Sequence, residues 1–357
     1  MLDNRKVIVD SFCEVKEFTG GFEDERFYNF DTHEIVPGAI YIISRQTFHK
    51  NIELIRQLAE NRTILPVLGN PAEGSETILS QLMTLGITDL VRQQRIAVIA
   101  GGEMQSDIPC FCFENFLPKI LDYNENLQAI EDYKQQWSEI RPYKFLFLNG
   151  RGRAHRRQLL SRLENLLSQA IYSNLDATHG QSIRLLPAKY EVDFYKDNTA
   201  LSHTGYIKYD LFKQEWGEIY LNSAAYNDTY FSLVTETVFD YPHSFRTEKI
   251  WKPMAMGHPW IAVANVGYYR DITSIGFKSF GGLIDESFDQ IENNQQRLER
   301  IAQEVEWLCQ QDLAKFAQES YNICKYNQQL LSQLQLQTRR ELPERITNFL
   351  KSYNERS

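Results

Sequence analysis

The chain has 357 residues, of which 43% are hydrophobic and 24% are charged, and its formal net charge is −9. This length exceeds one ordinary hydrophobic core and predicts two domains. The acidic balance disfavours general binding to nucleic acid or to an anionic membrane, since both select a basic surface. No segment approaches the roughly 20 consecutive apolar residues of a bilayer span, and the polar N-terminus does not resemble a signal peptide. We therefore expect a cytoplasmic protein without a membrane span.

The five cysteines are scattered and odd in number, which predicts small buried thiols instead of a disulfide framework. Cys110 and Cys112 stand close together, but no pair of histidines accompanies them, so we expect no metal site.

The first part of the chain alternates short apolar runs with helical patterns, which is typical of α/β folds. We predict buried strands at Lys6–Phe12, Gly38–Ser44, Arg62–Gly69 and Arg95–Gly102, and helices at Arg45–Asn61 and Glu76–Val91. A charged helical stretch over residues 126–140 then leads to Pro142. We place a domain boundary there, so that residues 1–140 form an N-terminal Rossmann-like domain.

A second alternation begins with an apolar run at Tyr143–Gly150. We predict a helix over Gln158–Ile171 and further strands within Tyr230–Thr237 and Trp260–Val266. From Asp285 onward the pattern is helical, with one apolar face formed by Ile291, Leu298, Ile301, Val305 and Leu308. We assign residues 141–290 to a second Rossmann-like domain and residues 291–357 to a C-terminal helical segment. The expected architecture is two doubly wound domains that face a cleft.

The segment "SFRTEKIWKPMAMGHPW" is typical of a loop that leads into a short helix. Thr247 suits the N-cap, Glu248 and Lys249 fall in the first turn, and Gly257 ends the pattern. A helix N-terminus with added positive charge binds anions, so Lys249 and Arg246 would contact phosphate. Glu248 would accept hydrogen bonds from ribose hydroxyls. A solvated helix start with a capping glutamate is the alternative, and spacing alone does not decide between them.

A second basic cluster follows the strand predicted at Tyr143–Gly150, in "NGRGRAHRR". Ligands of open parallel sheets bind beyond the carboxyl ends of strands, where this turn would lie. Its glycines allow close approach of the backbone, and Arg151, Arg153 and Arg156 could meet phosphate. Cations are unfavourable at a helix N-terminus unless an anion lies there too, which favours a bound anion over contacts with surface carboxylates.

Glu236 ends the strand predicted within Tyr230–Thr237, twelve residues before Glu248. A strand that ends there can bring both carboxylates to one side of the domain, although a merely polar strand end is equally compatible. The anion-site hypothesis requires that the turn near Arg153 and the turn near Lys249 converge. It fails if they lie on opposite sides of the molecule.

The stretch "YFSLVTET…SFRTEKIWKPMAMGHPWIAVANV" resembles the donor-binding half of glycosyltransferases of the GT-B fold. The similarity is to the α1,3-fucosyltransferase group and the exostosin-like enzymes, and it extends over about residues 143–289. The matching positions are Glu236, Thr237, Thr247, Glu248, Lys249 and Ile250. The sequence departs from the family pattern after the strand glutamate, where Thr237 alone replaces an Asn-Ser/Thr pair.

This resemblance implies a nucleotide-sugar donor, a GDP- or UDP-sugar, with its ribose on Glu248 and its phosphate on Lys249. One of Arg151, Arg153 and Arg156 would bind the diphosphate. The resemblance also implies transfer that needs no metal ion or other cofactor, with helix dipoles and cations stabilising the leaving group.

An inverting enzyme would use a carboxylate of the N-terminal domain to deprotonate a hydroxyl of a glycan, protein or small-molecule acceptor. Glu103 is the first candidate, Glu114 the second, and Glu23 or Asp24 the third, although each also suits a surface acid. One alternative is a nucleotide-binding protein without catalysis. Another is a protein that binds or modifies nucleic acid through "RGRAHRR".

Overall fold

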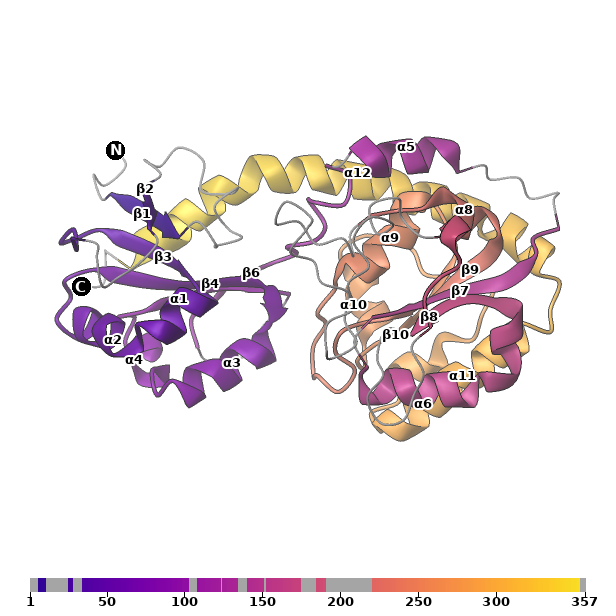
Figure 1. The fold of residues 1–357 in the computed structure, drawn as a ribbon, viewed down its shortest axis with the longest axis horizontal. Coiled ribbons are helices and arrows are strands. Elements are labelled where there is room, and N and C mark those ends of the chain that lie inside the picture. The colour runs from indigo at the N-terminus through magenta and orange to yellow at the C-terminus, as the bar shows by residue number, and fades with distance from the viewer. Residues whose placement is uncertain are drawn as a thin grey trace. The chain divides into compact units, whose positions relative to one another are not determined.

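A computed structural model of the chain describes residues 6–10, 25–27, 34–102, 108–122, 124–133, 140–150, 152–174, 184–190 and 220–353. The chain forms two compact units, each built on its own parallel sheet (Figure 1). Unit 1 comprises Met1–Asn115 and Leu336–Ser357, and unit 2 comprises Phe116–Gln335. The boundary differs from the one predicted after residue 140. The segment predicted over 291–357 also divides between the units.

The sheet of unit 1 has the strand order β2-β1-β3-β4-β5-β6, and every pair is parallel. Its strands are β1 (Val7–Asp10), β2 (Glu25–Phe27), β3 (Ile40–Ser44), β4 (Leu65–Gly74), β5 (Ala97–Gly101) and β6 (Phe111–Phe113). The prediction of an α/β fold with these four central strands is confirmed. Strand β2 pairs with one edge of β1, and β3 pairs with the other edge. The direction in which the chain adds strands to the sheet therefore reverses between β1 and β3.

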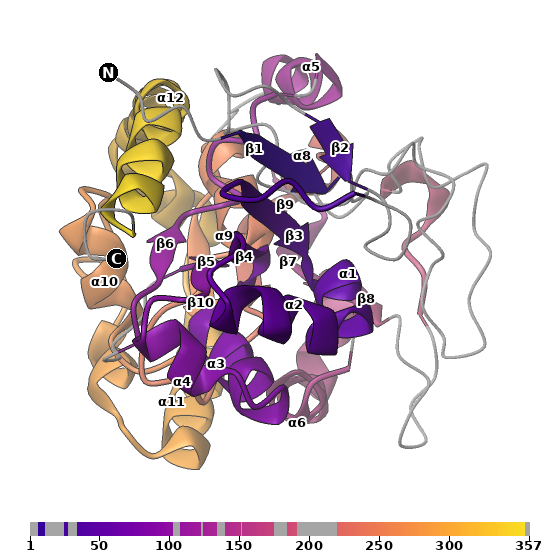
Figure 2. The ribbon, with the colours of Figure 1, turned by 90° about the vertical axis from the view of Figure 1, so that its left-hand side faces the viewer.

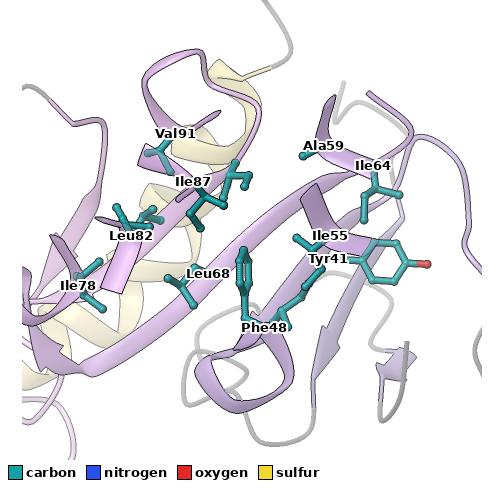
Figure 3. Packing of buried hydrophobic residues seen from close by; sticks show 14 of the residues in the cluster. Tyr41, Phe48, Ile55, Ala59, Ile64, Leu68, Ile78, Leu82, Ile87 and Val91 are labelled. Atoms are coloured by element: carbon teal, nitrogen blue, oxygen red, sulfur yellow. The ribbon is translucent and has the colours of Figure 1, made fainter. Parts of the chain in front are cut away.

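Both faces of this sheet are buried, which explains why its strands read as continuous apolar runs. Alternate residues point to opposite faces, so Ile8 and Tyr41 belong to one core cluster and Val9 and Ile42 to the other. The first cluster packs under α1 (Arg45–Lys50), α2 (Ile52–Glu60), α3 (Ser75–Thr84) and α4 (Thr88–Arg92) (Figures 2 and 3). The second packs under the last turns of α12 (Leu313–Ser352), through Leu342, Ile346, Leu350 and the following Tyr353.

The sheet of unit 2 has the order β10-β9-β7-β8, again with all pairs parallel. Its strands are β7 (Tyr143–Asn149), β8 (Ala170–Asn174), β9 (Thr229–Thr235) and β10 (Trp260–Val263). Phe145 at its centre is opposite Phe231 in the register, and their rings stack with centroids 5.6 Å apart. Here the winding reverses between β7 and β9. The carboxyl ends of these two strands are therefore the switch point where ligands bind in doubly wound sheets.

The helix predicted over Gln158–Ile171 is wrong in its second half. Helix α6 (Ala154–Arg162) ends early, a 3₁₀ segment η2 (Glu164–Gln169) follows, and β8 begins at Ala170. The leucine-rich sequence of this segment has good helical propensity, but tertiary packing often overrides so weak a preference. The pairing of β8 with β7 supplies hydrogen-bond partners for the backbone groups of both strands and buries Ala170 and Ile171.

Helices cover the sheet of unit 2. The remaining elements are α5 (Asn124–Asp132), η4 (Ala188–Tyr190), α8 (Ser223–Asn227), α9 (Glu248–Met256), α10 (Tyr268–Ser274), η6 (Glu286–Gln290) and α11 (Asn294–Leu308). Helix α11 packs against α6 and β10, and α9 packs against β9 (Figure 1). The first half of α12 contacts α9, where the Gln328 side-chain amide donates to the Ala255 carbonyl at 2.6 Å. Among the described helices, none combines the length and the apolar character needed to cross a membrane.

Candidate functional site

The carboxyl ends of β7 and β9 meet through two buried polar side chains. Thr235 Oγ1 donates to Asn149 Oδ1 at 2.8 Å, and Asn149 is only 2% exposed. The amide nitrogen of Asn149 has no hydrogen-bond partner among the described residues. A buried donor without a partner is costly in a protein interior and is more common at functional sites. The switch point therefore carries an unused donor.

Helix α6 begins five residues after Asn149, with a strongly basic first turn. Arg153 is its N-cap but makes no capping bond with its side chain, and no acidic residue lies in the first turn. Arg153 is exposed and remains accessible to an anion. Arg156 is buried instead, and donates through Nη2 to the carbonyls of Thr235 and Glu236 at 3.0 and 3.1 Å. Arg151 lies outside the described residues.

His155 supports the same connection between α6 and β9. Its Nε2 lies 3.1 Å from the Glu236 carbonyl oxygen, so this nitrogen carries the proton and donates. Burial, followed by the charge of Arg156, lowers the pKa of His155 to about 3, which makes the imidazole neutral at physiological pH. His155 and Arg156 thus fix α6 to the end of β9 and do not themselves face a ligand.

Glu236 is fully buried and uses its side chain within the protein. One carboxylate oxygen accepts from the Thr247 backbone at 3.2 Å and from the Tyr268 hydroxyl at 2.9 Å, and the other accepts from Thr247 Oγ1 at 2.6 Å. Burial raises the pKa of Glu236, and the charge of Lys249 and the Thr247 hydrogen bonds offset this in part. The role of Glu236 in the structure is to anchor the loop before α9 to β9.

Helix α9 begins and ends where the sequence predicts. Thr247 is its N-cap and accepts a hydrogen bond from the Lys249 backbone at 3.4 Å. Gly257 ends the helix in the left-handed conformation, with φ of 66°, and its N–H bonds to the Met254 carbonyl. The helix lies at the carboxyl end of β9 because Glu236 holds the cap residue there.

The two charged residues of the first turn of α9 bind each other. Lys249 Nζ lies 2.5 Å from Glu248 Oε1 and within 3.3 Å of the hydroxyls of Thr247 and Thr237. The Glu248 side chain is 3% exposed, whereas that of Lys249 is 22% exposed. Burial alone would raise the pKa of Glu248, but the charges of Lys249 and Lys252 outweigh it and lower the pKa. Lys249 can therefore face a ligand, and Glu248 is its buried counter-ion.

These contacts bring together the two turns that the sequence singled out. Arg156 bonds to the backbone of Glu236, the Glu236 carboxylate binds Thr247, and Thr247 accepts from Lys249. The turn that carries Arg153 and the turn that carries Lys249 therefore both border the end of β9. Arg246 lies in the loop before α9 and is buried at 1% exposure, so it is less accessible than expected for a phosphate ligand.

The loop that follows β9 is held from two sides by a stack of three side chains. The His155 ring stacks on Phe239 with centroids 5.2 Å apart, and the Arg297 guanidinium lies 4.3 Å from the centre of the same ring. Arg297, which is 1% exposed, also donates to the carbonyls of Phe239 and Ala264. This side chain comes from α11 and fixes the loop and the end of β10. Contacts from α6 and α11 thus hold the loop after β9 and the end of β10.

Sequence reasoning missed two members of the site. Asn149 ends a buried strand directly before a glycine, which is a signal that could have identified it. Tyr268 is buried at 1% exposure, and its hydroxyl donates a hydrogen bond to Glu236. Of the predicted acceptor bases, Glu114 follows β6 in unit 1 and is half-buried. Glu103, Glu23 and Asp24 lie outside the described residues.

Two hollows lie on unit 2, but neither is lined by residues of the switch point. Within the described parts of the chain, no group of three or more His, Cys, Asp or Glu side chains is arranged to hold a metal ion. No known family of protein sequences matches the chain, and no curated protein matches it either.

Proposed function

We propose that the protein is a glycosyltransferase whose unit 2 binds a nucleotide-sugar donor at the β7/β9 switch point. The observation that carries this proposal is the convergence of two basic helix starts on the end of β9. Arg153 would contribute an exposed guanidinium from the N-cap of α6, and Lys249 would contribute a partly exposed ammonium from α9. A nucleoside diphosphate is the ligand whose charge suits two helix N-termini and two cations.

Each part of the site has a role in this proposal. The backbone at Gly152 approaches the diphosphate closely, while the N–H groups of α6 and α9 donate to its oxygens. Lys249 turns from Glu248 towards phosphate, which leaves the Glu248 carboxylate to accept from ribose hydroxyls. The Asn149 amide supplies a further donor at the end of β7.

The proposed reaction is displacement at the anomeric carbon of the donor sugar. An acceptor hydroxyl forms the new C–O bond, the bond to the diphosphate breaks, and a carboxylate takes the hydroxyl proton. The nucleoside diphosphate leaves with the bonding electron pair, and its developing charge is stabilised by the helix dipoles and cations that bind the donor. Glu114 and Glu103 stay the predicted bases. Inversion at the anomeric carbon and a GDP- or UDP-sugar donor are part of the proposal.

A nucleotide-binding protein without catalysis is the second candidate. It is favoured by the internal use of the site residues, since Glu236 and Glu248 are both buried and hydrogen-bonded within unit 2. In this case a nucleotide would bind through Arg153 and Lys249 without transfer. Binding and turnover must therefore be measured separately.

The first experiment is a thermal-shift screen with GDP, UDP, CDP and ADP, because a ligand that binds the native state raises the melting temperature by linkage. Arg153→Gln is the decisive variant, since its side chain is exposed and its loss should not affect folding. Arg340→Gln, an exposed arginine on α12, is the matched control. We expect the nucleotide shift to fall in Arg153→Gln alone. Equal shifts in both variants would count against the site.

Nucleoside diphosphates that stabilise the protein then define the sugar donors to assay. Release of the diphosphate from a nucleotide sugar, stimulated by a hydroxyl acceptor, supports the glycosyltransferase. A nucleotide-induced shift without release from any donor and acceptor supports the binding protein. No shift with any of the four nucleotides would refute both.

A further inference from the structure

The two hollows of unit 2 adjoin each other across a short loop. They share Gly281, Ile284 and Asp285 as lining residues. The first, of about 370 Å³, extends over the start of α10 and η6, and the second, of about 670 Å³, extends along α11 to Trp307. Both volumes lie in the range of about 300–1,000 Å³ that is usual for ligand sites. We call the two together the 281–285 groove.

Trp307 differs from the other tryptophans that the structure describes. Trp251 and Trp260 are at most 1% exposed, whereas Trp307 is 44% exposed and lines the larger hollow. An exposed indole beside a concave surface presents a flat apolar face with a hydrogen-bond donor at its edge, which is typical of binding surfaces. Trp307 is therefore a candidate platform for a ligand that also has a flat apolar face.

The polar groups beside Trp307 are held in fixed positions. Arg300 donates to Asp285 Oδ2 at 2.6 Å and to Glu304 Oε2 at 2.9 Å, and the Asp285 backbone donates to Glu304 Oε1. A hydrogen bond from the Ser287 backbone and one from Arg300 lower the pKa of Asp285 to about 2. The larger hollow thus presents the ionised Asp285 carboxylate and the Arg300 guanidinium. The buried Glu304 carboxylate, whose side chain is 3% exposed, holds both in place before any ligand binds.

The balance of charge along the 281–285 groove is acidic. Its charged lining residues are Asp285, Glu286, Asp289, Glu304, Arg270 and Arg300. Four carboxylates against two guanidinium groups disfavour an anionic ligand. Hydroxyl and carboxamide groups complete the wall through Thr273, Ser279, Ser287, Gln290 and Gln303.

We propose that the 281–285 groove binds an oligosaccharide of neutral sugars, with one ring stacked on Trp307. A sugar ring has an apolar C–H face, which suits the indole, and a rim of hydroxyls that both donate and accept. Carboxylates accept from such hydroxyls, and the Arg300 guanidinium donates to them. Because the two hollows adjoin each other, they suit an oligosaccharide of several sugar rings better than a monosaccharide. No residue of the groove belongs to the nucleotide site, so this inference does not depend on the proposed function.

Glycine at position 282 offers a way to block the groove without disturbing the fold. A Cβ atom added at Gly282 meets no other atom within 4 Å, and this glycine lines the larger hollow. A Cβ at Gly281 would lie 2.9 Å from Glu286 Oε2 and is unsuitable. Gly282→Phe should therefore fold normally and fill the space beside Trp307. Leu336→Ala removes another exposed apolar side chain, 70% exposed on α12, and is the matched control.

The test uses the full chain on a microarray of neutral and acidic glycans, followed by calorimetric titration of the neutral glycan retained best. We expect Trp307→Ala to weaken that affinity roughly tenfold, as for loss of one stacked aromatic contact, and Gly282→Phe to abolish binding. Leu336→Ala should bind like the wild type. Melting temperatures of the three variants show whether each is folded.

Three results would overturn the proposal: retention of no neutral glycan, preference for acidic glycans, or equal affinity in wild type, Trp307→Ala and Gly282→Phe. Tetralysine serves as a separate probe, and its binding without any glycan binding would reassign the groove to basic peptides. Arg153→Gln should retain the glycan while losing the nucleotide shift. Failure of the groove is thereby distinguished from failure of the nucleotide site.

Discussion

Replacement of Lys249 by alanine tests whether Glu248 depends on it as a buried counter-ion. The ammonium lies 2.5 Å from a carboxylate whose side chain is 3% exposed, so Lys249→Ala leaves a buried negative charge behind. Removal of one partner of a buried ion pair typically costs about 3–5 kcal/mol. Lys249 is itself 22% exposed and Lys252 also stabilises the charge, which places the expected loss near the lower limit, about 3 kcal/mol.

The assay is thermal and urea-induced unfolding at pH 7. For a unit of this size, about 3 kcal/mol corresponds to a decrease in melting temperature of roughly 6–12 °C. Lys315→Ala is the matched control, because Lys315 pairs with Glu319 at 3.8 Å on the surface, where both side chains are exposed. A surface pair contributes about 0–1 kcal/mol, so this variant should remain close to the wild type. Glu248→Gln added to Lys249→Ala should recover much of the lost stability.

The pH dependence provides a second readout. The lowered pKa of Glu248 means that its ion pair stabilises the protein above the unfolded pKa, and that this contribution is lost as the pH falls through the folded pKa. In Lys249→Ala, burial without the ammonium raises the pKa of Glu248, so the carboxylate takes up a proton on mild acidification. The difference in free energy of unfolding between Lys249→Ala and the wild type should therefore become smaller as the pH falls from 7 to 4. If Lys249→Ala were as stable as Lys315→Ala at pH 7, Glu248 would not depend on Lys249.

Three further predictions concern unit 2. Glu236→Gln should lower the free energy of unfolding by about 1–3 kcal/mol in urea, since a buried hydroxyl loses its acceptor. Because burial raises the pKa of Glu236, the wild type loses stability as the pH rises through that pKa. The difference in free energy of unfolding between the wild type and Glu236→Gln should therefore decrease as the pH rises. An increase in this difference would contradict the prediction. Gly257→Ala should lower the free energy of unfolding, measured by calorimetry, by about 1–2 kcal/mol, because alanine is strained at a φ of 66°. Gly282→Ala should leave the stability unchanged. Equal melting temperatures of the two variants would refute backbone strain at position 257. Burial lowers the pKa values of His155 and His258 to about 3, so both imidazoles stay neutral in the folded protein. The free energy of unfolding should therefore decrease as the pH falls below about 6.5, the ordinary pKa of histidine. An unfolding midpoint that stays constant down to pH 4 would exclude this.

Local chemistry explains which parts of the fold could be predicted. The start and end of α9 follow from Thr247 as N-cap and Gly257 as terminator, and both act within a few residues of the chain. The strands of unit 1 were predictable because sheets buried on both faces have continuous apolar runs. Neither signal contains the order of strands in a sheet. The switch point between β7 and β9, which makes the turn at Arg153 adjacent to the turn at Lys249, depends on pairing between distant segments.

The roles of the charged residues were harder to predict than their positions. Residues i and i+1 do not ordinarily face each other on a helix, so sequence spacing gave no reason to pair Glu248 with Lys249. At the first turn the long lysine side chain reaches back, and burial of the carboxylate makes that contact favourable. Likewise, the spacing of Leu342, Ile346 and Leu350 predicts an apolar helix face, but the sheet that this face covers begins more than three hundred residues earlier.

The chain leaves unit 1 at Asn115 and returns to it within α12, so that unit 2 is inserted into unit 1. During vectorial synthesis the strand face that contains Val9 and Ile42 is made before unit 2, whereas the residues that cover it, Leu342 to Tyr353, are made after unit 2. Unit 2 can complete its own core in the meantime. Until Tyr353 has been made, the nascent first unit exposes an apolar sheet face, so we expect its demand for chaperones to persist while unit 2 is synthesised.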